Sequence, residues 1–315
     1  KNRPDLSVSV QSGYIDGKPN AANKQDKKPS EPVETPATQL RGAVWSLVPK
    51  RSLSTSVVVN YLDMPNNGGL LSAAVKIETD AAEFIQSGNK QTAEVDLVGF
   101  VINSDGKQVG NFSERIAADF RTSDLNKTER ADIYYNYQTK LAPGLYQVRV
   151  ASRDVKSGRV GSAVQWIEIP DLSSKRLALS SLLLGERTEN GKPQQESALA
   201  DSALAGTQIS VDRRFSSSSH LRYVIFIYNA SSGKNGTTLP NVTLQTHVLR
   251  GNNIVMASPE RQVSVEGQDS SRLSYAAEIL LSNLPSGRYE LVVTIQDRAA
   301  KTNAQKRVWF EVKKL

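Results

Sequence analysis

"LAPGLYQVRVASRD" (141–154) aligns without gaps with "LPSGRYELVVTIQD" (284–297), at a constant offset of 143 residues. The alignment continues beyond both segments, with identities at Leu141/Leu284, Gly144/Gly287, Tyr146/Tyr289, Val150/Val293, Asp154/Asp297, Trp166/Trp309 and Glu168/Glu311. An offset of this length corresponds to a whole domain and is far longer than a solenoid repeat. The sequence therefore predicts a tandem duplication of one domain.

The repeated aromatic residues indicate what kind of domain this is. Tyr146 and Tyr289 each follow a glycine-containing turn and begin a strand. In a tyrosine corner, a tyrosine at this place packs its ring under a β-sandwich and bonds its hydroxyl to the backbone. Trp166 and Trp309 fall in the last strand of each repeat, where we expect them to be core anchors. For all four residues the pattern favours a structural role over ligand binding.

Segments of alternating apolar and polar residues lie along both repeats. In the first repeat we expect strands near 54–62, 70–78, 92–103, 108–119, 132–141, 145–153 and 160–169. In the second, a strand from 176 precedes others near 207–211, 220–229, 241–250, 271–281, 287–297 and 305–313. Seven strands in about 120 residues are typical of an immunoglobulin-like sandwich. The prediction is an all-β chain of two tandem immunoglobulin-like or fibronectin-like β-sandwich domains, 39–170 and 171–315.

Short helical segments are expected beside the strands. Residues 39–49 are apolar enough to pack as a short helix that ends at Pro49. Asp80 with Glu83 resembles an N-cap and N3 pair, which predicts a one-turn helix in 80–88. The segment 194–206 is expected to form a short helix or an ordered loop that ends at Gly206.

The N-terminal segment has the pattern of a strand that is detached from both domains. Residues 6–11 read "LSVSVQ", a strict alternation that turns one face toward a core. That apolar face consists of Leu6, Val8, Val10 and Tyr14. Residues 16–38 are polar and rich in proline and lysine, so they cannot bury enough apolar surface to offset their ordering entropy. We therefore expect a donor strand in 1–15 and a flexible linker in 16–38, of which residues 16–36 could span roughly 65 Å when extended.

Composition and motifs argue against catalysis. The chain has no cysteine, which rules out disulfides, thiolate metal sites and a cysteine nucleophile. His220 and His247 stand alone, with no cluster of zinc ligands in the pattern. The sequence contains no G-x-S-x-G motif, P-loop or dinucleotide fingerprint. We expect no enzymatic activity, no catalytic residue, no metal and no cofactor.

The balance of charge and hydropathy limits the partners. The net charge is +7, but the densest basic cluster, "KQDKKP" (24–29), lies in the linker without any aromatic residue. This pattern favours a solvated linker over a nucleic-acid site. No apolar run approaches the roughly 18 residues that a membrane helix needs. The basic balance remains compatible with weak attraction to acidic polymers or cell surfaces.

Five N-x-S/T triplets occur, and three of them crowd one predicted loop, 229–243. Their asparagines, Asn229, Asn235 and Asn241, are candidate glycosylation sites and would mark that loop as exterior.

An ordered series of segments resembles a known family. "RPDLSVSVQSGY" (3–14), "VDLVGFVINSDGKQVGNF" (95–112), the stretch 141–185 and "DRRFSSSSHLRYVIFIYN" (212–229) resemble the region C-terminal to the A-type domain in acidobacterial von Willebrand factor A-related domain proteins. The resemblance implies a secreted bacterial protein and supplies no enzymatic residues. The A-type domain with its D-x-S-x-S metal motif is absent from these residues, and "DLSSK" (171–175) lacks the spacing. Metal-dependent adhesion is therefore not assigned.

Two functions fit these observations. In the first, the chain is a non-enzymatic extracellular subunit of a filament or surface assembly, because Leu6–Tyr14 is donated to the open sheet edge of a neighbouring copy. In the second, the chain is a monomeric adhesion, carbohydrate-binding or spacer module, and the strand is the cut end of an A-type domain. The long charged tether favours the first. The expected partner is the chain itself, with cell-surface polysaccharide as a second candidate and a secreted or surface location.

Overall fold

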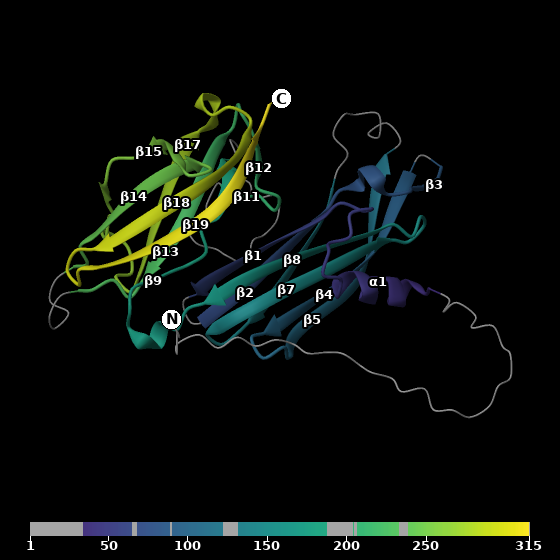
Figure 1. Ribbon diagram of the computed structural model, residues 1–315, viewed down its shortest axis with the longest axis horizontal. Coiled ribbons are helices and arrows are strands. Elements are labelled where there is room, and N and C mark those ends of the chain that lie inside the picture. Colours follow the sequence, from purple (N-terminus) through teal and green to yellow (C-terminus); the bar gives the residue numbers. More distant parts are fainter. Residues whose placement is uncertain are drawn as a thin grey trace, which may run out of the picture. The chain divides into compact units, whose positions relative to one another are not determined.

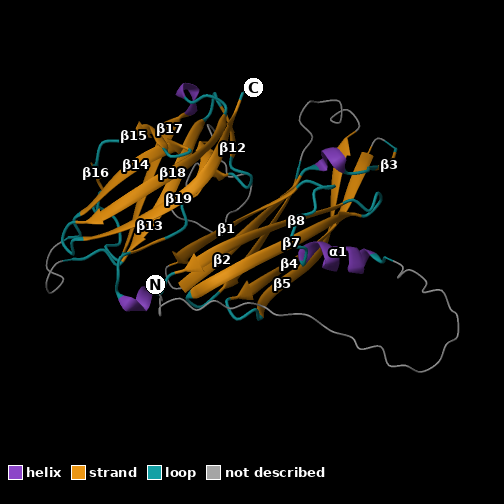
Figure 2. Cartoon of the chain, viewed as in Figure 1, coloured by secondary structure: helices purple, strands orange, loops and turns teal. Residues whose placement is uncertain are grey.

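The computed structural model describes residues 34–64, 68–88, 90–121, 132–187, 204, 207–232 and 239–314 (Figure 1). These residues are mostly β-strand, arranged in four sheets with one α-helix and short 3₁₀ turns (Figure 2). No helix among them is long and apolar enough to cross a membrane. The predicted donor strand, most of the linker and nearly all of 194–206 lie outside the described residues.

Two sheets enclose the core of the first half. One is antiparallel, in the order β1-β2-β6, with β1 (Thr55–Met64), β2 (Gly68–Ile77) and β6 (Ile133–Lys140). The other sheet has the order β5-β4-β7-β8, and the short β3 pairs with the first residues of β4. Its strands are β3 (Ile85–Ser87), β4 (Lys90–Asn103), β5 (Gln108–Arg121), β7 (Gly144–Asp154) and β8 (Val160–Ile169). Apart from β3, these strands match the expected ranges to within a residue or two at each end.

Alternation of side chains explains why these segments form a two-layered, sandwich-like structure. Along β4, Val95 and Leu97 point into the core and are fully buried, while Asp96 between them faces outward. The turn into β5 uses the Asp-Gly pair that the sequence predicts, and Gly106 adopts a positive φ of 77° there. A register shift at Val101 marks a β-bulge close to this turn.

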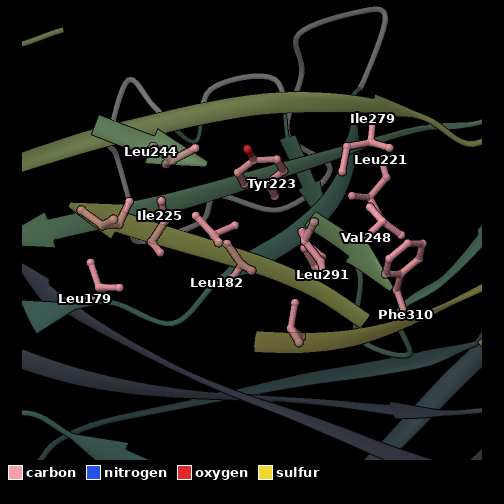
Figure 3. Packing of buried hydrophobic residues seen from close by; sticks show 14 of the residues in the cluster. Leu179, Leu182, Leu221, Tyr223, Ile225, Leu244, Val248, Ile279, Leu291 and Phe310 are labelled. Carbon is pink, nitrogen blue, oxygen red and sulfur yellow. The ribbon is translucent and has the colours of Figure 1, made fainter. Parts of the chain in front are cut away.

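Two further sheets enclose the second core. The first has the order β11-β10-β13-β17, with β9 also on β13: β9 (Ala178–Leu179), β10 (Leu183–Arg187), β11 (Thr207–Ile209), β13 (His220–Tyr228) and β17 (Arg272–Leu280). The second has the order β12-β19-β18-β14-β15, with β16 on β14: β12 (Arg214–Ser216), β14 (Val242–Arg250), β15 (Asn253–Ala257), β16 (Arg261–Gln262), β18 (Gly287–Asp297) and β19 (Thr302–Lys313). The pair β12–β19 is parallel. Figure 3 shows side chains such as Leu221, Ile225 and Leu291 packed between the strands.

The repeated sequence occupies the same place in both halves. Strands β7 and β8 pair so that Tyr146 lies opposite Ile167, and β18 and β19 pair so that Tyr289 lies opposite Phe310. The neighbouring order β4-β7-β8 in the first half corresponds to β14-β18-β19 in the second. The repeated sequence thus lies in strands with the same neighbouring order in both halves.

Strand β13 is buried on both faces, which explains its continuous apolar run "YVIFIY". Tyr223 and Ile225 belong to the second core, whereas Val224 and Phe226 pack with the core of the first half. Strand β1 also contacts the second half of the chain, because Ser181 Oγ accepts a hydrogen bond from the Tyr61 amide at 2.8 Å. Residues from Thr35 onward accordingly form one compact unit.

Helix α1 (Pro36–Val44) covers part of the outer face of the β4–β7–β8 sheet (Figure 1). Thr35 caps it by accepting a hydrogen bond from the Thr38 amide at 3.2 Å, and proline follows at the first helical position. These signals place the helix earlier than the predicted 39–49. Leu40 and Val44 pack against Ala151 of β7.

The one-turn helix predicted in 80–88 is wrong. Only Thr79–Ala81 forms a 3₁₀ turn, its N-cap is Glu78, and no side chain makes a capping hydrogen bond there. The chain becomes extended again at Ala82 and continues into β3, so strand pairing overrides the local helix signal.

Candidate functional site

The two repeated tyrosines form matching corners. The Tyr146 hydroxyl donates a hydrogen bond to the Ala142 carbonyl at 2.8 Å, and the Tyr289 hydroxyl donates to the Pro285 carbonyl at 2.5 Å. Both rings are buried. Each tyrosine thus closes a loop of four residues at the start of its strand, which is the contact that defines a tyrosine corner.

The prediction that Trp166 and Trp309 are core anchors is wrong. Their side chains are 55% and 39% exposed, because each lies on the outer face of its strand. In β8 the core positions are occupied by Ile167 and Ile169, so the alternation turns Trp166 outward. The equivalent residues of β19 have the same arrangement around Trp309.

The two tryptophans differ in what covers them. Arg213 and Arg288 stack on the Trp309 ring, with their guanidinium carbons 5.7 Å and 4.7 Å from its centroid. Arg213 is only 8% exposed, and this burial lowers its pKa to about 10. Trp166 has no ring or cation in stacking contact among the described residues.

Two aspartates that end the repeated segment have a role that sequence reasoning missed. Asp297 is 1% exposed and accepts hydrogen bonds from the amides of Ser231 at 2.7 Å and of Ala299 and Ala300 at 3.0 Å each. Asp154, also buried, accepts from the Ser157 amide at 2.8 Å. Each carboxylate holds the hairpin that follows its strand. The sequence contained a signal for this role, because aspartate occurs at both 154 and 297, which are 143 residues apart in the repeat.

The other predicted residues are dispersed. Leu6, Val8, Val10, Tyr14 and Asn235 lie outside the described residues. The Asn229 side-chain amide donates to the Leu172 carbonyl at 2.9 Å and to the Arg176 carbonyl at 3.2 Å, so its nitrogen is engaged. Asn241 is exposed, and its side-chain oxygen accepts from Gln262. Those predicted residues that the structure describes are not brought together as one site.

The described chain contains a charged cluster and a surface depression. Lys76 Nζ lies 2.7 Å from Asp212 and 2.9 Å from Asp132, and these carboxylates raise the lysine pKa although burial opposes its charge. This cluster joins β2 to the segment before β12. A depression of about 650 Å³ lies near Asn229 and Asp297, and Ser231 and Ser271 are among the residues that line it. No group of three potential metal ligands occurs in the described residues.

Strand β5 presents a long edge that no other described strand covers. It spans Gln108–Arg121 and pairs only with β4. The Glu94 carbonyl accepts from the Val155 amide, so even-numbered residues of β4 direct their backbone toward β7 and odd-numbered residues toward β5. Because Val95 pairs with Ile116 and Leu97 with Glu114, the even residues of β5 bond to β4. The backbone groups of the odd residues therefore face the open edge: Asn111, Ser113, Arg115, Ala117 and Asp119.

A second exposed feature lies on the outer face of β7 and β8. We call it the aromatic face; its residues are Trp45, Leu47, Val48, Leu145, Val164 and Trp166. Leu47 and Trp45 are 95% and 47% exposed. Arg149 holds Trp45 at this place, because its guanidinium lies 5.5 Å from the ring and donates to the Val44 carbonyl at 3.2 Å. Trp45 also stacks on Phe100, at a centroid distance of 5.7 Å.

Comparisons with known proteins give little further guidance. No protein-family model and no curated protein matches the sequence. Among solved structures, this chain is similar to a Bacteroides uniformis beta-glucuronidase, at 11% identity and a TM-score of 0.25. It is also similar to a calcium-binding mutant of beta-glucuronidase 2 from that organism, at 10% identity and a TM-score of 0.26. Both matches cover 76% of this chain and 26% of the enzyme, so the chain spans about a quarter of their length.

Proposed function

We propose that this chain is a non-enzymatic, secreted structural protein built from two tandem immunoglobulin-like or fibronectin-like β-sandwich domains. Copies join into a filament or surface assembly because the N-terminal strand of one subunit adds to a sheet edge of the next. Backbone hydrogen bonds along the edge supply affinity, and alternate side chains supply specificity. A head-to-tail contact that does not close into a ring generates a polymer.

The observation that carries this proposal is the β5 edge. An edge strand of this length, with its outward backbone groups unpaired within the described chain, is a template for strand addition. Within the described chain, the ion pairs along this strand engage side chains: Arg115 with Asp96, and Asp119 with Lys90. Those side-chain contacts leave the outward backbone donors and acceptors available for a fifth main strand.

The side chains beside β5 suit the apolar face of the proposed donor strand. Phe112 is buried, while Ile116 and Ala118 are partly buried on the core side of β5. Tyr135 and Tyr137 of β6 lie across from them, with ring centroids 5.1 Å and 4.8 Å from Phe112. Leu6, Val8 and Val10 of a neighbouring copy would extend this apolar layer, and each fully buried side chain contributes about 1.5–3 kcal/mol.

Two adjacent alanines provide a sharp test. Ala117→Pro removes an amide that faces the open edge, so the sheet keeps its own hydrogen bonds while strand addition is blocked. Ala118→Pro is the matched control, because the Ala118 amide faces its partner Ala93 in β4. We expect Ala117→Pro to abolish polymers in negative-stain images at nearly unchanged thermal stability, as deletion of 1–15 should. Ala118→Pro should instead lower the melting temperature. Undiminished polymers from Ala117→Pro and from the deletion would contradict the proposal.

The alternative is a monomeric adhesion or carbohydrate-binding module, and the aromatic face is the observation that favours it. Exposed apolar patches with a polar rim mark interaction sites on soluble proteins. Size-exclusion chromatography with light scattering separates the two functions. A monomer at all accessible concentrations supports the module, whereas a ladder of oligomers that disappears on deletion of 1–15 supports the assembly.

A further inference from the structure

The register of β7 and β8 surrounds Trp166 with polar groups. Gln147 is its cross-strand partner, and Glu168 follows two residues along the same face. The Gln147 oxygen accepts from Arg149 Nε at 2.7 Å, which fixes the amide beside the ring. A flat, half-exposed indole bordered by an amide and a carboxylate matches a sugar ring, which has apolar C–H faces and hydroxyl groups at its edge.

The second repeat shows that this openness is specific to Trp166. The equivalent ring of Trp309 is covered by Arg213 and Arg288, and its cross-strand partner is Glu290. The counterpart of Arg288 in the alignment is Leu145, which leaves a neutral, exposed side chain beside Trp166. The same fold position is thus closed by guanidinium groups in one half and open in the other.

The rim of the aromatic face is basic. The segment that follows α1 carries Lys50 and Arg51, both exposed, one proline after Leu47 and Val48. This segment is anchored to β8, since the Lys50 amide donates to Ser162 Oγ at 2.9 Å and the backbone of Arg51 forms an isolated antiparallel β-bridge with Gly161. Arg41 in the last turn of α1 adds an exposed cation.

Acidic groups near this face are few or already paired. Glu168 lies at one end of it, and Asp96 farther along the sheet is held by Arg115 at 2.6 Å. The face therefore combines exposed tryptophans with an excess of positive charge. Cations and aromatic planes together complement a polymer that is both anionic and built of sugar rings.

We propose that the aromatic face binds an acidic polysaccharide. Sugar rings stack on Trp166, whose ring is open, and the carboxylates of the polymer pair with Lys50, Arg51 and Arg41. The face is open rather than enclosed, which suits a passing chain instead of a small ligand. This inference adds a ligand to the proposed surface protein and does not depend on strand donation, because β8 lies at the opposite side of its sheet from β5.

Alginate, a polyuronate, is a suitable probe, with dextran as the neutral control. The full-length chain is titrated with each polymer while tryptophan fluorescence is followed, since the protein has three tryptophans. We expect alginate to shift the fluorescence and dextran to leave it unchanged. Trp166→Ala should weaken alginate binding about tenfold, which corresponds to loss of one stacked ring, whereas Trp309→Ala, which alters the covered ring, should bind as the parent does.

Charge variants complete the test. Lys50→Glu with Arg51→Glu should weaken alginate binding and reduce its dependence on salt, because fewer ion pairs form. Equal alginate affinity for the Trp166→Ala variant and the parent would overturn the proposal. Equal binding of dextran and alginate would overturn the acidic specificity. If the parent forms a dimer that Trp166→Ala abolishes, and does not bind alginate, the face would instead be assigned to contacts between copies. If Trp166→Ala loses alginate binding but still forms protein filaments, the polysaccharide site is separate from the proposed assembly.

Discussion

Asp297 offers the most direct test of how the repeated hairpins are held. Its carboxylate is buried and accepts three backbone hydrogen bonds, at 2.7, 3.0 and 3.0 Å. Asp297→Asn replaces one acceptor oxygen by a donor that faces an amide donor. A hydrogen bond to a charged group contributes about 1.5–3 kcal/mol, and a buried donor without an acceptor adds a further cost. We expect a loss of about 3 kcal/mol in the free energy of unfolding, and about 10 °C in Tm for a chain of this size.

Urea denaturation followed by circular dichroism measures this loss, and calorimetry gives the shift in Tm. Asp269→Asn is the matched control, because Asp269 is exposed and accepts from one amide, that of Ser271 at 2.9 Å. Its effect should be much smaller. If Asp297→Asn unfolds at the same urea concentration as the parent, the carboxylate does not stabilise the hairpin and the reasoning is wrong.

Three further predictions concern packing and protonation. Tyr146→Phe and Tyr289→Phe should each lower the free energy of unfolding by about 1 kcal/mol in urea titrations, since each removes one corner hydrogen bond; unchanged midpoints would contradict the corner assignment. Gly99→Ala should destabilise the protein by about 1–3 kcal/mol in the same titration, because the new Cβ would lie 2.1 Å from the Phe112 ring; a neutral effect would show that the ring can move. Burial raises the pKa of Tyr228 to about 12, and it also raises the pKa of Tyr61 and of Tyr223. The folded state then holds protons that the unfolded state releases above pH 10, so stability should fall as the pH rises from 10 to 12; a flat Tm over that interval, with phenolate absorbance rising in the folded protein, would refute it.

Most of the strand layout is predictable from the sequence because alternation is a local property. In "VQWIEI" (164–169) the isoleucines and the tryptophan fall on opposite faces, so the sequence also contained the signal that Trp166 faces outward. The large indole favoured a core position, but Trp166 is adjacent to the buried Ile167 and must therefore lie on the opposite face of the strand. Alternation along the strand is the stronger guide, because a strand can direct only every second residue to the core.

Contacts between distant segments could not be predicted in the same way. The bond between Ser181 and Tyr61 joins residues that no local pattern links. The arginines on Trp309 likewise come from separate strands and loops, and Arg213 reaches the ring from a left-handed backbone conformation with φ of 54°. The open edge of β5 follows from which strands pair, and an alternating pattern is the same for an edge strand and a central one.

Site-specific cross-linking between two populations of the chain tests strand donation most directly. The protein has no cysteine, so introduced thiols report only on their own positions. One population carries Ser9→Cys in the proposed donor strand, and the other carries Ala117→Cys or Ser113→Cys on the outward side of β5. Cross-strand neighbours lie close enough for a disulfide. A third population carries Val255→Cys on the exposed strand β15 as the control. Donation predicts disulfide-linked pairs between Ser9→Cys and a β5 cysteine but not the β15 cysteine; equal linkage to both strands, or none, would contradict it.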